Sequence, residues 1–575
     1  MKPKNPYIFF DRYCLRTPVL SLDFYRSLNK YDKIPTDIWS KIWEDSVIKE
    51  AVFLASPELF GEIDKWFQKE ITDTKTIARL QNSLLKYLSR MTSRCTPFGL
   101  FAGCSLGSFS SKPEISLTDI SQYQRQTRFD MHFLVALAQQ LAHTNVIKDQ
   151  LTWYPNTSLY SIGDQYRYIE YTYTKNNRRE HSIEAVTISP YLESIIAEAE
   201  NGASIDELAS LLVGDEITKE EATDFIYELI ENQLLVSELE PSICGEDFLT
   251  QLITILNRLE GITTSQKKLN TFTQALIALD KTIGNPITQY HNFIEQVKEM
   301  ESPMEQKYLL QTDVYPATTS NQLDIKWGYR IQRLLSLFNK ITPAPQNTHL
   351  QKFATAFYNR YETREVPLTT VLDTEIGIGY LQNQKASDST PFLEGLGIPA
   401  KRTTISSLDW SPFYEVLHKK LESFKTSGAQ FLEIKDSDFN TFQESWDTIP
   451  DTISGMAELV SIDGKEKMFL SSLGGSSATN LLGRFTTGTN ELREYVQEIT
   501  TLEQKLKPNH ILAEIIHLPE SRIGNVIQRA EIREYEIPYL GKSNVSKHHQ
   551  IGIQDLMVSV QNGKVHIRSK KLIKY

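Results

Sequence analysis

Two arginines beside a Thr-Pro-Phe-Gly turn are the groups in this sequence whose type and spacing most clearly indicate chemistry. Arg90 and Arg94 lie one helical turn apart, and Thr96 and Pro97 follow them closely. Proline disfavours the α conformation of the residue before it, so a helix that carries both arginines ends here. Like charges one turn apart repel each other, so the pair is stable only in water or against an anion. Spacing alone leaves both interpretations open.

The helix that positions these arginines is predicted over residues 75–94, which contain no acidic residue. Leucines at helical spacing supply a buried stripe, and four cations share one face of the helix: Arg79, Lys86, Arg90 and Arg94. Such a face is usually solvated, and the alternative is a surface for a polyanion. Gly99 then turns the chain into an apolar strand that is expected to begin near Phe98.

Arg484 is a third candidate cation. It follows the glycines Gly474, Gly475 and Gly483, which can form a backbone nest for phosphate. The sequence has no GxxxxGK[ST] motif, which argues against an ATP site. A surface arginine in a hairpin connection is the simpler explanation of the same residues.

Two aspartates complete the candidate set. Asp130 precedes a helix expected from about Met131, so an N-cap explains it. Asp313 lies in a predicted strand, Gln311-Thr312-Asp313-Val314, and a turn at the strand end explains it equally well. Either carboxylate alternatively orients an arginine or acts as a base.

Other kinds of site have little support. The four cysteines form no CxxC pair and the eleven histidines form no HExxH motif. The sequence therefore predicts no metal site, and a serine hydrolase has little support. With 575 residues and a formal charge of −11, it predicts a multi-domain protein that does not coat nucleic acid non-specifically. The absence of a signal peptide and of any membrane-length apolar run predicts a cytoplasmic, soluble protein.

The pattern of elements predicts an α+β fold, with mixed helices and antiparallel sheets in several subdomains. Residues 1–149 combine a strand around Arg16-Thr17-Pro18-Val19-Leu20 with helices at about 36–54, 57–70 and 75–94. Residues 241–341 read as mainly helical, including an amphipathic helix at 322–341. Residues 342–575 follow a linker at 342–347 and contain two hairpins, with turns at Asp463-Gly464 and Asn562-Gly563.

Residues 150–240 have the order of a winged helix. A hairpin turns at Gly163-Asp164, three helices begin at Ser189, Ser204 and Thr218, and the strand Leu234-Leu235-Val236 follows. Glu207 and Glu221 lie three residues after Ser204 and Thr218, so capping boxes are expected at both helix starts. The third helix is acidic, so it would repel the phosphates of DNA. A groove between this helix and an edge strand suits an extended peptide better. Phe225, Leu229, Leu235 and Val236 are the expected contacts.

The motifs resemble, in order, the N-terminal glutamylation domain of LanB-type lantibiotic dehydratases. The specific match is Arg90, Arg94 and Thr96-Pro97-Phe98-Gly99, and the weaker matches follow in register over essentially the whole chain. These weaker matches are Arg16 to Leu20, Arg128-Phe129-Asp130, Gln311-Thr312-Asp313, Ile376-Gly377-Ile378-Gly379, Leu473 to Ser476 with Gly483-Arg484-Phe485, His517-Leu518-Pro519-Glu520, and Gly524-Asn525-Val526.

The resemblance implies transfer of glutamate from glutamyl-tRNA to Ser and Thr side chains of a ribosomally made precursor peptide. Its catalytic positions fall on Arg90, Arg94, Thr96, Asp130, Asp313 and Arg484. Arg16 belongs to the same set of family positions, and with Lys86 and Arg79 it is expected to bind the tRNA. The leader of the precursor is expected on the winged-helix module. No cofactor is expected besides glutamyl-tRNA as co-substrate, because the ester is already activated.

The expected partners follow from the same resemblance. They are the precursor peptide, glutamyl-tRNA, a cyclase and a separate elimination protein, since no segment here resembles the family's elimination domain. The chain is therefore expected to be a fragment or part of a split system. Two other functions stay open: a peptide–aminoacyl-tRNA ligase, and a non-catalytic scaffold that binds precursor peptides. The sequence does not decide whether the chain forms a homodimer.

Overall fold

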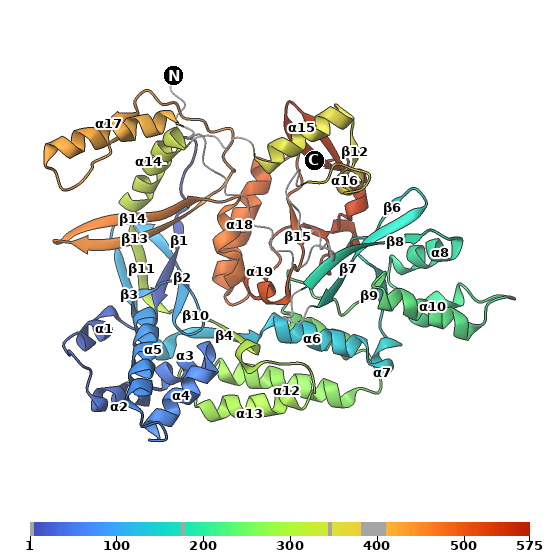
Figure 1. Cartoon of the computed structure of the whole chain (residues 1–575), viewed down its shortest axis with the longest axis horizontal. Coiled ribbons are helices and arrows are strands. Elements are labelled where there is room, and N and C mark those ends of the chain that lie inside the picture. Colours follow the sequence, from blue (N-terminus) through green and yellow to red (C-terminus); the bar gives the residue numbers. More distant parts are fainter. Residues whose placement is uncertain (1–4, 174–178, 343–347, 381–409, 575) are drawn as a thin grey trace, which may run out of the picture.

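The computed structural model describes residues 5–173, 179–342, 348–380 and 410–574. It combines many helices with several small sheets, as the α+β prediction required (Figure 1). The predicted linker at 342–347 falls almost entirely outside the described residues. In the described part of the chain, no helix is both long and apolar enough to cross a membrane.

A four-stranded sheet in the order β1-β2-β11-β3 forms one side of the candidate site. Its strands are β1 (Arg12–Pro18), β2 (Ala102–Ser110), β3 (Glu114–Leu117) and β11 (Thr318–Asp324). β1 and β2 are antiparallel, with Arg16 opposite Cys104, whereas β11 runs parallel to β2. The sheet thus joins strands separated by about two hundred residues of sequence, and it crosses the predicted boundaries at 149 and 240.

A second antiparallel pair lies beside this sheet. β4 (Gln124–Phe129) pairs with β10 (Leu310–Tyr315), and Asp313 is opposite Gln126. Gly103 of β2 packs so closely on β10 that an added Cβ would lie 2.1 Å from the carbonyl oxygen of Val314. A buried ion pair joins β4 to the helix of residues 46–55. Arg125 Nη1 of β4 lies 2.5 Å from Glu50 Oε1, and both side chains are fully buried.

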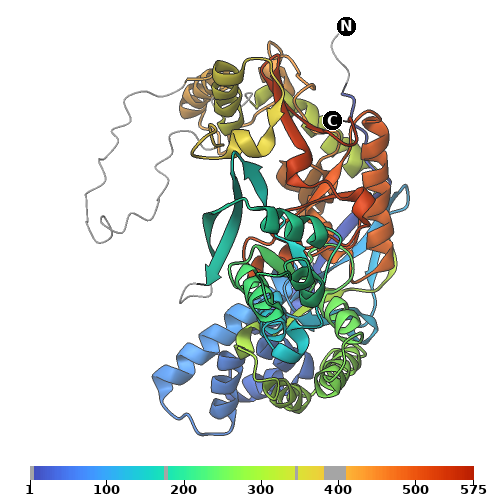
Figure 2. The ribbon, with the colours of Figure 1, turned by 90° about the vertical axis from the view of Figure 1, so that its right-hand side faces the viewer.

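Helices cover the lower end of the molecule in both views (Figures 1 and 2). They are α1 (Leu22–Leu28), α2 (Thr36–Glu44), α3 (Ser46–Ala55), α4 (Pro57–Phe67), α5 (Thr74–Ser93), α6 (Met131–Ala142), α7 (Asn145–Lys148), α11 (Phe248–Leu256), α12 (Thr263–Leu279) and α13 (Ile287–Lys298). Their apolar faces form one large core cluster, which includes Leu84, Phe129, Phe133 and Phe293. This core fixes the base on which β4, β10 and α5 rest.

Residues 150–240 contain the elements that the sequence predicted. They are β5 (Trp153–Pro155), β6 (Tyr160–Ile162), β7 (Gln165–Tyr173), β8 (Arg179–Thr187), α8 (Pro190–Ala199), α9 (Ile205–Ser210), α10 (Lys219–Glu231) and β9 (Leu235–Ser237). Both predicted capping boxes are present, at Ser204 with Glu207 and at Thr218 with Glu221. The winged-helix assignment of this module stays a prediction.

The C-terminal part occupies much of the upper half of the molecule in Figure 1. Its elements are α14 (Lys326–Ile341), α15 (His349–Tyr361), β12 (Val366–Pro367), α16 (Leu368–Leu372), α17 (Pro412–Ser427), β13 (Ser454–Ile462), β14 (Lys465–Gly474), α18 (Asn490–Leu506), β15 (Ala513–Ile516), α19 (Gly524–Ile527), β16 (Tyr535–Pro538), β17 (Leu556–Gln561) and β18 (Lys564–Ser569). The predicted hairpins at Asp463-Gly464 and Asn562-Gly563 are confirmed as β13–β14 and β17–β18.

Three element boundaries differ from the prediction. The helix expected at 36–54 divides at Asp45, whose carboxylate accepts from the N–H of Val47 at 2.8 Å and caps α3. The helix expected at 322–341 begins only at Lys326, because the preceding residues pair as β11. The strand expected near Phe98 begins at Ala102, since residues before it form a turn.

Candidate active site

The basic helix α5 ends where the sequence predicted. Asp73 caps its start by accepting from the N–H of Thr76 at 2.8 Å, and Arg94 is the C-cap residue. The N–H of Arg94 donates to the carbonyl of Arg90 at 3.2 Å. Arg79 and Lys86 are exposed along the same helix. The cations therefore stand on the face of α5 opposite its buried leucines.

Arg90 and Arg94 are close together and lack acidic partners. The Arg90 guanidinium lies 4.2 Å above the ring of Phe98, and burial followed by the charge of Arg94 lowers the pKa of Arg90. The Nε of Arg90 is buried with no hydrogen-bond partner. Within the described ranges, no carboxylate lies at ion-pair distance from either arginine. The pair is thus available to an anion.

The Thr-Pro-Phe-Gly turn joins α5 to the first sheet. The N–H of Phe101 donates to the carbonyl of Phe98 at 2.9 Å, and Gly99 has a φ of +50°, which favours glycine. The N–H of Val19 donates to Phe101 at 2.9 Å, so the end of β1 is fixed to the same turn. Thr96 is exposed beside Arg94.

Arg16 on β1 lies between this turn and the glycine-rich loop. Its Nη1 donates to the sulfur of Met456 at 3.8 Å, and its Nη2 donates to the carbonyl of Leu481 at 3.4 Å. Burial and the carboxylate of Glu458 raise the pKa of Cys95, and the charge of Arg16 opposes them. Arg16 is therefore near Cys95, which lies between Arg94 and Thr96 in the sequence.

Two arginines clamp the carboxylate of Asp313. Arg484 Nη2 lies 2.5 Å from Asp313 Oδ1, and Arg128 Nη2 lies 3.1 Å from Asp313 Oδ2. Asp313 is 1% exposed. The Nε atoms of both arginines are buried without hydrogen-bond partners. Asp313 was expected either to orient an arginine or to act as a base. Its two ion pairs favour the first of these roles.

Arg128 is a site residue that sequence reasoning did not select. It belongs to the Arg128-Phe129-Asp130 motif and is 4% exposed. Besides Asp313, it donates to the carbonyl of Asn525 at 3.2 Å and to Gln126 Oε1 at 3.3 Å. Its position two residues from Asp130 in a matched motif was the signal that could have identified it.

A tight contact positions Arg484. Arg484 lies in a short 3₁₀ helix, Gly483–Phe485, and the Tyr315 hydroxyl lies 3.5 Å from the carbonyl oxygen of Phe485. Tyr315 is on β10, two residues from Asp313. An added Cβ at Gly488 would lie 1.9 Å from the hydroxyl of Tyr315. Glycine at 488 thus permits the loop to approach β10.

The loop before Arg484 is fixed by a buried carboxylate, Glu503 of α18. Glu503 accepts hydrogen bonds from Ser477 at 2.7 Å and from Thr452, and it forms an ion pair with Arg533. Thr452 in turn accepts from the N–H of Ala478 at 2.8 Å. These contacts hold the segment that supplies the Leu481 carbonyl to Arg16.

Asp130 is the N-cap residue of α6, which is the simpler of the two roles that the sequence suggested for it. Its carboxylate accepts from the N–H of His132 at 2.8 Å, and the residue is 6% exposed. In the described part of the chain, no ion pair joins Asp130 to an arginine. Its catalytic role stays a prediction, as do those of Arg90, Arg94, Thr96, Asp313 and Arg484.

The predicted peptide contacts are unequally accessible. Phe225 and Val236 are half-buried, whereas Leu229 and Leu235 are buried in the core. Val236 lies opposite Tyr154 in the β5–β9 pair. The longer strand β8 pairs only with β7, so its outer edge is free in the described sheet. Ile183 on β8 is 48% exposed.

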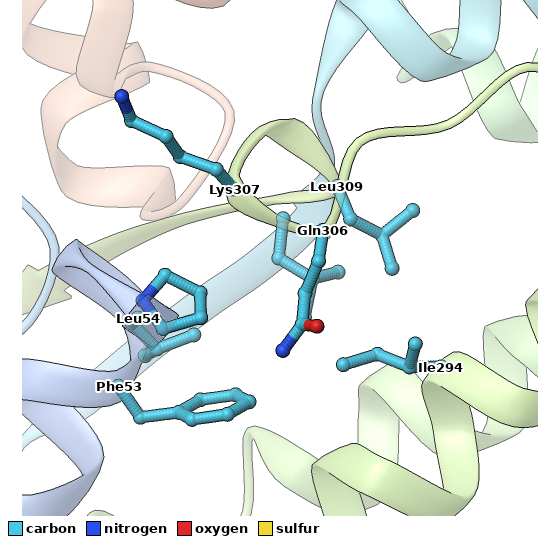
Figure 3. Close-up of a pocket in the computed structure, with 8 residues that line it drawn as sticks. Phe53, Leu54, Ile294, Gln306, Lys307 and Leu309 are labelled. Atoms are coloured by element: carbon cyan, nitrogen blue, oxygen red, sulfur yellow. The ribbon is translucent and has the colours of Figure 1, made fainter. Parts of the chain in front are cut away.

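One cavity of the fold has none of the site arginines in its lining. It is a narrow space between α3, α13 and the segment before β10, with room for about one water molecule. Figure 3 shows Phe53, Leu54, Ile294 and Leu309 around it, while the Lys307 side chain extends away from them. Among the described residues, no group of His, Cys, Asp or Glu has the arrangement of a metal site.

The arrangement suits recognition of an anion with a reactive carbonyl. Arg90 and Arg94 offer unpaired guanidinium groups, which can grip phosphate or carboxylate bidentately. Arg16 is held by Met456 and the Leu481 carbonyl, and Arg484 is held by Asp313, so both add fixed donors. Fixed donors of this kind stabilise an oxyanion that forms during acyl transfer, and one donor typically contributes about 10²–10³ in rate.

Comparison with known proteins finds relatives named for the biosynthesis of subtilin, epidermin and nisin. Subtilin biosynthesis protein SpaB of Bacillus subtilis is 25% identical over 576 residues, an alignment that covers 97% of this chain and 53% of SpaB. This chain thus spans about half the length of the curated relatives it matches.

Two solved structures share the fold. The tRNA-dependent lantibiotic dehydratase MibB from Microbispora sp. 107891 superposes with a TM-score of 0.78 at 18% identity, over 98% of this chain and 54% of MibB. The glutamylation domain TbtB from thiomuracin biosynthesis, bound to 5'-phosphodesmethylglutamycin, superposes with a TM-score of 0.61 at 15% identity, over 94% of this chain and 66% of TbtB. The family model for the N terminus of lantibiotic dehydratases matches residues 44–575, and the chain belongs to that family.

Proposed function

We propose that this chain transfers glutamate from glutamyl-tRNA to Ser and Thr side chains of a ribosomally made precursor peptide. The observation that carries the proposal is the pair Arg90 and Arg94 at the end of α5. Neither arginine has an acidic partner in the described structure, and Arg16 lies nearby. The chain as a whole is acidic, so a polyanionic donor needs such a local cationic site. Membership of the dehydratase family supports the same chemistry.

The reaction assigns a role to each group of residues. The peptide hydroxyl oxygen attacks the ester carbonyl, its proton passes to a base, and the ribose oxygen of the tRNA leaves. Arg90, Arg94 and Thr96 would bind the glutamyl ester, while Arg16, Arg79 and Lys86 would contact the tRNA. Because Asp313 is occupied by two arginines, its role would be to orient Arg484.

The precursor would bind at a distance from this site. We assign its leader to residues 150–240, where a peptide can add as a strand to the free edge of β8. Strand addition uses backbone hydrogen bonds, so it tolerates varied leader sequences. Figure 2 shows the β7–β8 ribbon in teal toward one side of the molecule.

The test is transfer of labelled glutamate from glutamyl-tRNA to a synthetic Ser/Thr-rich peptide by the purified chain. We expect a gain of one glutamyl residue on an internal hydroxyl, as a base-labile ester, and none after ribonuclease treatment. Arg90→Ala and Arg94→Ala should abolish transfer without changing peptide affinity. Lys41→Ala, which removes an exposed cation of α2, is the matched control.

Two outcomes would assign another function. A base-stable amide at the peptide C-terminus would identify an aminoacyl-tRNA ligase. Peptide binding without any tRNA-dependent product would identify a scaffold. Loss of peptide binding in Arg90→Ala would instead place the peptide on α5.

A further inference from the structure

The β13–β14 hairpin is a two-stranded ribbon whose faces differ in character. Residues opposite each other in an antiparallel pair share a face. Glu458 is opposite Phe469, Val460 is opposite Lys467, and Ile462 is opposite Lys465, so these six residues form one face. We call it the arm face. Figure 1 shows the hairpin extending from the body above α5, with its turn pointing away from the other elements.

The opposite face of the hairpin is turned toward the protein. Glu466 on that face forms an ion pair with Lys326 of α14 at 2.9 Å, and Met468 and Leu470 are half-buried. On the arm face, Phe469 is 61% exposed and Lys465 and Lys467 are exposed. The arm face therefore carries an exposed aromatic ring and two cations, and in the described structure no other element packs on that ring.

The arm face continues into the arginine site. Met456 alternates with Glu458 along β13, and its sulfur accepts from Arg16 Nη1 at 3.8 Å. Burial is the main cause that raises the pKa of the Cys95 thiol, and Glu458 is close enough for its charge to raise this pKa further. Cys95 is the residue between Arg94 and Thr96. One end of the arm face thus borders the proposed glutamyl site, and the other end carries Lys465 and Lys467.

From this continuity we infer that the arm face binds the single-stranded 3′ end of the aminoacyl-tRNA. Phe469 stacks on a base next to the acylated nucleotide, and Lys467 and Lys465 contact phosphates. The inference rests on the proposed function. Because glutamate is attached to the terminal nucleotide, the neighbouring nucleotides must leave the arginine site along one of its walls.

The chemistry of the arm face suits single-stranded nucleic acid better than a peptide. An aromatic side chain flanked by cations is the usual platform for stacked bases, and every base has a face to stack. Glu458 is the single acid of the arm face, and it lies at the end nearest the arginines. Phosphates are therefore directed toward Lys467 and Lys465.

The experiment measures binding of two probes to the full chain by fluorescence anisotropy: intact tRNA, and the same tRNA without its single-stranded 3′ end. Phe469→Ala should weaken binding of intact tRNA by about 5- to 150-fold and leave the truncated tRNA unaffected. Phe469→Trp should restore binding. Lys467→Ala should lower the slope of log K against log salt by about 0.7.

Leu459→Ala is the control, because Leu459 is an exposed apolar residue of the same hairpin on the face away from Phe469. It should leave both affinities unchanged. Equal binding of intact tRNA by Phe469→Ala and the unmodified chain would refute the arm assignment while leaving the proposed function intact. Weaker binding of a model peptide by Phe469→Ala would show that the arm face binds the precursor peptide and not the tRNA. Failure of the unmodified chain to bind tRNA would overturn both proposals.

Discussion

Arg484 and Asp313 form an ion pair at 2.5 Å although 171 positions separate them in the sequence. The pair joins the glycine-rich loop to β10, and Arg128 completes it from β4. Because both arginines retain a buried Nε without a partner, the carboxylate is the main contact that balances their charge. The clamp therefore couples the stability of this region to the geometry of the proposed site.

Replacing the carboxylate should expose this coupling. Asp313→Asn keeps the side-chain shape but leaves the buried Arg128 and the half-buried Arg484 without a countercharge, so we expect the free energy of unfolding to fall by roughly 3–5 kcal/mol. Transfer should fall by about 10²–10³, as expected for the loss of one fixed donor. Denaturant unfolding and single-turnover transfer measure the two effects. Unchanged stability would show that the clamp does not hold the loop.

Gly488→Ala should displace the Arg484 loop by steric conflict. The new methyl group would lie 1.9 Å from the Tyr315 hydroxyl, so we expect a loss of about 1–3 kcal/mol in unfolding free energy. Gly552→Ala is the control, since no atom lies within 4 Å of its added Cβ. Thermal unfolding compares the two. If both variants unfold alike, the close approach of Gly488 to Tyr315 is unimportant.

Binding of tRNA should weaken as salt rises, because contacts to phosphates release counterions. Lys86 is exposed on α5. Lys86→Ala should reduce the slope of log K against log salt by about 0.9 if its ammonium group contacts one phosphate of the tRNA. Titrations at several salt concentrations measure this slope. A flat salt response of the unmodified chain would remove the reason for a basic helix.

Leader binding should depend on the edge of β8. Ile183→Glu places a charge on the exposed strand, and we expect the affinity for the leader to fall by about tenfold, equivalent to roughly 1.4 kcal/mol. Val236→Glu tests the shorter strand β9 in the same way. Leu211→Glu alters an equally exposed apolar residue of the same module and serves as the control. Isothermal titration measures each affinity, and a loss confined to Val236→Glu would move the peptide to β9.

Protonation of His517 should lower the free energy of unfolding as the pH falls below about 6.5. Burial lowers the pKa of His517, whose Nδ1–H donates to the carbonyl of Tyr539 at 3.0 Å. A lowered pKa means that the unfolded chain binds the proton first, so protonation favours unfolding between the ordinary pKa and the lowered one. His517→Gln should flatten this dependence, and exposed His548→Gln should not. Denaturant unfolding at pH 5.5 to 8 tests the difference.

The sequence by itself determined the local elements of this protein. The capping boxes at Ser204 and Thr218, the turns at Asp463-Gly464 and Asn562-Gly563, and the end of α5 at Arg94 all formed as predicted. Each depends on residues within a few positions of one another, so its energetics are contained in a short segment.

Only the tertiary structure decided which distant residues meet. β11 joins the first sheet parallel to β2, and because of this pairing the helix predicted at 322–341 begins only at Lys326. Arg128 entered the site, and Asp313 became a clamp for Arg484, through the pairing of β4 with β10 and the approach of the Gly488 loop. Such contacts depend on strand register and on packing against a shared core, which no single segment encodes.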